Sequence, residues 1–112
     1  MGTMVLNRDA KILNEELKRL SLLVALDMAD ISDDLATAEL ETDPDERKGL
    51  RSGAREFLES ASSYDISLNR LKSDGALNVT ETAEADRLLQ GVSIIVAAGK
   101  SILHMTRQRR VA

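Results

Sequence analysis

The sequence contains no cysteine and no tryptophan, and its 112 residues include one phenylalanine, one tyrosine, one proline and one histidine. Without cysteine there is no disulfide, no thiolate nucleophile and no cysteine-ligated zinc site. The near absence of aromatic side chains removes the platforms on which single-stranded nucleic acids stack their bases. A core built without them consists of Leu, Ile, Val, Ala and Met, which is typical of packed helices.

The chain also lacks an excess of positive charge. Its 15 Lys and Arg residues are outnumbered by 19 Asp and Glu residues, which gives a net charge of −4 at pH 7. Nonspecific binding to phosphate backbones needs a positive field, so the surface as a whole does not favour it. There is no basic-then-apolar leader pattern, and the apolar stretch at 88–103 is short for a bilayer and interrupted by polar residues. We expect a cytoplasmic protein without a membrane partner.

Apolar residues recur at steps of three and four in three long segments, which is the period of amphipathic helices. We predict helices at about 7–40, 44–73 and 80–107, with flexible ends at 1–5 and 109–112. The stripe in the second segment is unbroken, so we expect both other helices to pack against it. Its members are Leu50, Ala54, Phe57, Ala61, Tyr64, Leu68 and Leu71.

The first turn carries the most specific local signal. Asp43 is suited to the N-cap position of the second helix, Pro44 to its first position, and Glu46 to the third, so the three residues predict a capping box. This pattern places the helix start at Pro44.

The second turn is marked by Gly75, which suits the left-handed position that ends a helix. After it, either Asn78 with Glu81 or Thr80 can cap the third helix. Both alternatives place the start of that helix close to residue 80.

The turns and stripes together predict an all-α protein, an antiparallel up-down-up bundle of three long helices forming a single domain over 1–112. In this arrangement Met28 lies opposite Phe57, and Ala54 lies opposite Gly99. Large residues face small ones at such levels, as interdigitating helices require.

The apolar residues of the first and third helices exceed what a narrow three-helix core can cover. An exposed surplus of this kind favours self-association, most simply as a homodimer. The alternative is that a kinked helix or a thicker bundle buries the surplus internally. The predicted oligomer or partner interface consists of Leu22, Leu26, Ala29, Gly91, Ile94 and Ala98.

Asp27, Asp30 and Asp34 lie on one face of the first helix. Carboxylates at this spacing can hold a hard cation, but the Glu-x-x-His motifs of di-iron bundles are absent. We favour a solvated face on which Arg51 lies near Asp34 and Arg55 near Asp30. No metal ligand is predicted.

The C-terminal end of the chain contains the only histidine, His104, and a short basic run with Arg107, Arg109 and Arg110. His104 is interpreted as an ordinary residue near a helix end. The three arginines are candidates for contact with nucleic acid or an acidic partner. The preferred interpretation is that they stabilise the negative end of the helix dipole.

No nucleophile motif, phosphate-binding glycine loop or cofactor motif is present, so no catalytic or cofactor-binding residue is predicted. The favoured hypothesis is a non-enzymatic protein–protein interaction module, such as an adaptor, chaperone, inhibitor or regulatory subunit. Its expected partners are a second copy and an unidentified protein, with no cofactor and no small-molecule substrate. The alternatives are a nucleic-acid-associated regulator that uses the basic tail and a metal-binding or catalytic bundle.

Overall fold

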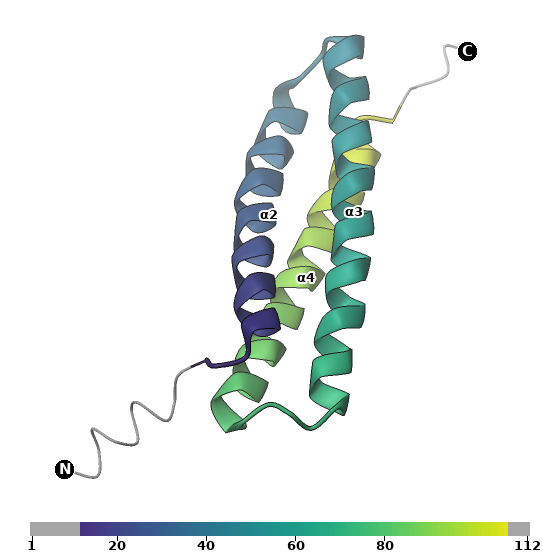
Figure 1. Cartoon of the computed structure of the whole chain (residues 1–112). Helices are drawn as coiled ribbons and strands as arrows, with labels where there is room; N and C mark the ends of the chain where they lie inside the picture. The colour runs from purple at the N-terminus through teal and green to yellow at the C-terminus, as the bar shows by residue number, and fades with distance from the viewer. Residues whose placement is uncertain (1–11, 108–112) are drawn as a thin grey trace, which may run out of the picture.

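The computed structural model describes residues 12–107, which form three long helices: α2 at Glu15–Leu40, α3 at Pro44–Ser73 and α4 at Val79–Met105. The helices lie side by side and are joined by short loops, so that α2 and α4 run parallel and α3 runs against both (Figure 1). The prediction of an all-α bundle of three packed helices is confirmed. The 30 residues of α3 span about 45 Å at 1.5 Å per residue.

α3 begins where the sequence predicts, but its cap differs in detail. The carboxylate of Asp43 accepts the N–H of Asp45 at 2.9 Å, and Pro44 occupies the first helical position. The N–H of Asp43 donates to the Glu41 carboxylate at 2.9 Å. The preceding loop thus supplies the acceptor that the capping-box prediction assigned to Glu46.

The turn between α3 and α4 follows the prediction closely. Gly75 has φ of +69°, the left-handed conformation that glycine adopts without strain. Asn78 and Glu81 form the capping box: the Asn78 side chain accepts the Glu81 N–H at 2.7 Å, and the Glu81 carboxylate accepts the Asn78 N–H at 3.0 Å. Of the two alternatives for this start, the structure uses Asn78 with Glu81.

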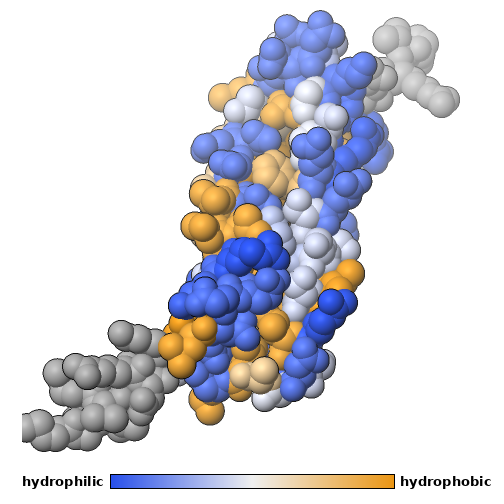
Figure 2. Space-filling model, in the orientation of Figure 1, coloured by the Kyte–Doolittle hydropathy of each residue, from blue (hydrophilic) through white to orange (hydrophobic). Residues whose placement is uncertain are grey.

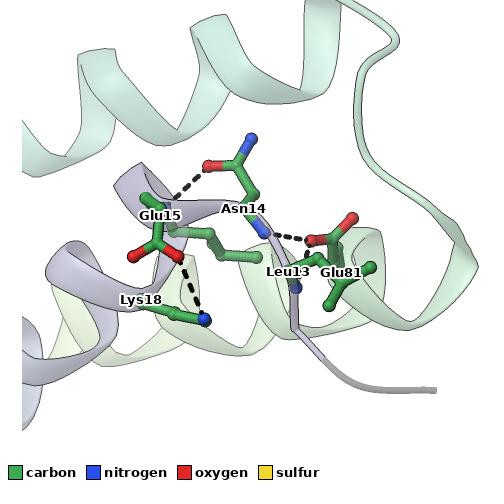
Figure 3. Close-up of polar contacts among 6 residues, drawn as sticks. Leu13, Asn14, Glu15, Lys18 and Glu81 are labelled. Atoms are coloured by element: carbon green, nitrogen blue, oxygen red, sulfur yellow. Dashed lines mark hydrogen bonds and ion pairs between the residues drawn. The ribbon is translucent and has the colours of Figure 1, made fainter. Parts of the chain in front are cut away.

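The start of α2 is a correction, because the helix begins at Glu15 and not near residue 7. The buried Glu81 carboxylate accepts the N–H groups of Leu13 at 2.8 Å and Asn14 at 2.6 Å, as Figure 3 shows. The Asn14 side chain then caps α2 by accepting the Leu17 N–H at 2.9 Å. These bonds hold Leu13 and Asn14 in a non-helical path, and residues 1–11 lie outside the described part of the chain.

The core is centred on α4 and not on α3, which corrects the expectation that the second predicted helix is central. α4 packs extensively against both neighbours, whereas α2 and α3 share a much smaller interface. Only one large apolar side chain of α3 is fully buried, so α3 covers one side of the core and does not form its centre. The buried apolar residues are Leu17, Leu20, Val24, Ile31 and Ala38 in α2; Ala54, Ala61 and Leu68 in α3; and Ala85, Leu88, Val92, Ile95, Ala98 and Ile102 in α4.

Two glycines of α4 set its distance to the other helices. A Cβ on Gly91 would lie 3.0 Å from Val24 Cγ1 and 2.9 Å from Met28 Sδ, so α2 approaches closely there. A Cβ on Gly99 would lie 3.6 Å from the carbonyl oxygen of Ala54. The prediction that Ala54 lies opposite Gly99 is therefore confirmed.

α4 is also the one helix of the described residues that is long and apolar enough to cross a membrane by length and composition. The same properties belong to a helix at the centre of a bundle. Nine of the 27 residues of α4 are buried within the bundle.

Candidate interaction surfaces

The predicted interface residues on α2 all lie on the surface. Leu22 is 62% exposed and Leu26 is 52% exposed, and Ala29 is exposed on the same side of the helix. On α4, Ile94 is 54% exposed. Hydrophobic residues are visible along the α2 edge of the molecule (Figure 2). These four residues form the part of the predicted interface that is accessible to a partner.

Gly91 and Ala98 are corrections, because both are buried inside the bundle. Gly91 faces Val24 and Met28 of the same chain. Its small size serves the packing of α2 on α4 and not the approach of a second copy. Part of the apolar surplus predicted from the sequence is thus buried in the core, and the rest is exposed.

A second, mostly apolar stripe runs along the exposed side of α2, opposite the stripe that is buried in the core. We call it the outer seam. Its positions are separated by steps of four, three, four, three and four, the spacing by which one helix packs against another. One member is acidic, and Leu40 at its end is 85% exposed. The outer seam consists of Leu22, Leu26, Ala29, Asp33, Ala36 and Leu40.

A shallow apolar groove runs between α3 and α4, with a volume of about 660 Å³. Its walls include Leu58 from α3 and Val92 and Val96 from α4. Asp65 and Lys100 place one acidic and one basic group in its lining. The sequence analysis did not single out this groove, because its residues come from the inner margins of two helices whose rotation was not known.

A basic groove of about 450 Å³ lies between α3 and α4, nearer the C-terminal end of α4. Apart from Leu103, the described residues that line it are all basic: Arg51, Arg55, Lys100, His104 and Arg107. The structure therefore brings Arg107 together with the α3 arginines. Arg109 and Arg110, the other two tail candidates, lie outside the described residues.

An acidic groove of about 530 Å³ lies on the other side of α3, between α2 and α3. Its charged residues are Asp27, Asp30, Asp33, Asp34 and Glu56. Within residues 12–107 no group of acidic or histidine side chains has an arrangement that could hold a metal ion. Partial burial and the neighbouring carboxylates of Asp30 and Asp33 raise the pKa of Asp34.

The predicted pairing of Asp34 with Arg51 and of Asp30 with Arg55 is wrong. Both arginines line the basic groove on the α4 side, while the aspartates line the acidic groove on the α2 side. The physical reason is the rotation of α3 about its axis. One residue corresponds to about 100° around a helix, so a small error in the assumed rotation moves a side chain to the other neighbour.

The last turn of α4 is held by arginines of α3, a feature that the sequence analysis missed. Arg47 donates to the carbonyl oxygens of Met105, at 2.7 Å, and of Glu41, at 3.1 Å. Arg51 donates to the carbonyl oxygen of Thr106. The carbonyls at a helix end have no partner within the helix, so these bonds satisfy them from a neighbouring helix. The sequence signal for this arrangement was the four-residue spacing of Arg47 and Arg51, which places both side chains on one face of α3.

Tyr64 makes a polar contact across the smaller α2–α3 interface. Its hydroxyl donates to the Asp27 carboxylate at 2.7 Å. Partial burial and the proximity of this carboxylate raise the pKa of Tyr64 to about 12. The contact lies at the edge of the acidic groove, whose lining includes Asp27 and Ser60.

No protein-family model, no curated protein and no solved structure matches this chain. The surfaces of the bundle therefore provide the basis for a functional proposal.

Proposed function

We propose that the protein is a non-enzymatic interaction module that forms a homodimer through the outer seam of α2 and engages a further protein through its remaining helix faces. The observation that carries the proposal is the outer seam itself. Leu22, Leu26 and Leu40 are large apolar side chains at helix-packing spacing and more than half exposed. Burial of apolar surface is the main driving force of association, and such a stripe gains most when another helix covers it.

Charges on either side of the apolar stretch from Leu22 to Ala29 favour a second copy in antiparallel orientation. A two-fold axis between Ala25 and Leu26 places Leu22 of one copy opposite Ala29 of the other. The same axis places Lys18 opposite Asp33, so that opposite charges flank the apolar centre on both sides. A two-fold pair of this kind uses one surface patch twice and closes on itself.

The test is sedimentation equilibrium of the whole chain at tens of micromolar. We expect twice the 12.3 kDa mass of one chain and a monomer for Leu26→Lys, which places two charges at the centre of the dimer. Ile66→Lys is the matched control, because Ile66 is 56% exposed but lies on α3. A monomeric wild type, or equal effects of the two variants, would contradict the proposal.

The orientation has a separate test by charge exchange. Lys18→Glu alone places like charges opposite each other and weakens the dimer. Adding Asp33→Lys to the same chain restores the opposite pairing at both ends, and with it the wild-type association. Because exposed ion pairs contribute only about 0.2–1 kcal/mol each, the change is measured as a shift of the dimer dissociation constant at low salt. A double variant weaker than Lys18→Glu would exclude the antiparallel register.

A further inference from the structure

We propose that the basic groove between α3 and α4 binds a ligand that carries several adjacent phosphate groups. The groove combines Arg51 and Arg55, one turn apart on α3, with Lys100 and His104, one turn apart on α4. Arg107 closes the end of the groove. Basic side chains of both α3 and α4 thus line the groove.

The charge of the groove is exceptional within this protein. The chain has a net charge of −4, yet none of the described residues that line the groove is acidic. The four ion pairs within residues 12–107 use other cations, namely Lys18, Arg19, Lys72 and Arg87. None of the groove's cations therefore forms an ion pair with a carboxylate in the described part of the chain, and the acidic residue Glu39 lies in the lining of a neighbouring hollow that shares His104 and Arg107.

One member of the groove is already positioned. Arg51 donates to the carbonyl of Thr106 at the end of α4, which fixes the guanidinium at the groove wall. Arg55, Lys100 and His104 are exposed and have room to close on a ligand. A partly pre-arranged site loses less conformational freedom on binding than a set of free side chains.

The chemistry of these groups selects the ligand. Arginine offers a planar fork that matches the oxygens of phosphate, and lysine adds a compact positive charge. Four permanent cations around about 450 Å³ match a run of phosphates better than a single carboxylate. No Phe, Tyr or Trp is among the described lining residues, and the one aromatic ring there is the imidazole of His104, so recognition rests mainly on the phosphates. Such a run occurs in an oligophosphate and in a nucleic-acid backbone.

The experiment is calorimetric titration of the whole chain at low salt with three probes: tripolyphosphate, a short single-stranded DNA and hexaglutamate. We expect binding of tripolyphosphate or of both phosphate probes, weakened by added salt as counterion release requires. If tripolyphosphate binds and DNA does not, the source is an oligophosphate. If DNA binds more tightly, the source is a nucleic-acid backbone. Hexaglutamate binding as tightly as the better phosphate probe would overturn the assignment to phosphate.

The variant Arg55→Gln with Lys100→Gln locates the site. We expect it to weaken binding by roughly tenfold or more, since each substitution removes a charge-assisted contact. The control is Lys48→Gln with Arg70→Gln, which removes the same charge from exposed positions of α3 outside the groove lining. Circular dichroism establishes that both proteins are folded. Equal loss in the two variants, or no binding of either phosphate probe to the wild type, would overturn the proposal.

Discussion

At the scale of single residues, Glu81 is the most consequential side chain of the described structure. Its carboxylate accepts three backbone N–H groups, one in its own cap and two at the start of α2. The sequence indicated the first of these bonds as one of two alternative caps, because capping is a local pattern. The other two were not predictable from local patterns, since Leu13 and Asn14 lie 68 and 67 residues away along the chain.

The backbone hydrogen bonds from Asn78, Asn14 and Leu13 lower the pKa of Glu81. A lowered pKa means that the folded state prefers the ionised carboxylate. The stabilisation is therefore complete above the ordinary pKa of 4.5 and is lost as the pH falls through the lower native value. We predict that Glu81→Gln lowers the melting temperature at pH 7 by roughly 5 °C or more. This difference from wild type should shrink at acidic pH.

Thermal melts followed by circular dichroism between neutral and acidic pH measure this effect. Glu59→Gln is the control, since Glu59 is exposed on α3, and it should leave the melting temperature nearly unchanged. A pH-independent loss for Glu81→Gln would mean that its ionisation plays no part in stability.

At the scale of the elements, the contact between α2 and α4 explains why the predicted interface was only partly right. Periodicity shows which face of a helix is apolar but not which neighbour covers it. α4 has apolar residues around much of its circumference, so Gly91 and Ala98 fitted an outer interface as well as an inner one. The structure assigns both to the core and leaves Leu22 and Leu26 outside.

Gly91→Val is predicted to destabilise the bundle by about 1–3 kcal/mol, the usual cost of overpacking. Even a single added carbon would lie within 3.0 Å of Val24 and Met28 side chains, and valine in a helix has little rotamer freedom to move away. Urea denaturation measures the change. Gly49→Val is the matched control, because no atom lies within 4 Å of a Cβ at that position. If both variants unfold at the same urea concentration, the close packing of α2 on α4 is refuted.

At the scale of the whole molecule, α3 separates an acidic groove from a basic one. The sequence analysis expected the same residues to neutralise each other across α2 and α3. Helix identity, order and direction followed from periodicity and turn signals, and the bounds of α3 agree with the prediction at both ends. The rotation of each helix depends on side-chain packing over the full length of the bundle, and local patterns do not contain that information. The pairing of charges was wrong for this reason.

The carboxylates of the acidic groove repel one another, so replacing one of them by a neutral side chain should stabilise the folded state. The pKa of Asp34 is raised, so its charged form is disfavoured in the folded state. Asp34→Asn should therefore stabilise the protein at pH 7 and low salt by about 0.2–0.5 kcal/mol for each like-charge pair removed. The gain should fall with added salt, and also as the pH drops through the raised pKa, where Asp34 itself becomes neutral.

Urea denaturation at two salt concentrations checks this expectation. Asp65→Asn serves as the control, because Asp65 is exposed and lies outside the acidic groove. A loss of stability in Asp34→Asn would show that the carboxylate makes a favourable contact there.

The shared carboxylate of Glu81 also bears on how the chain is made. The chain is synthesised from its N-terminus, so the N–H groups of Leu13 and Asn14 are made before the Glu81 carboxylate to which they donate. The start of α2 therefore reaches its final form only after the synthesis of α4 has begun.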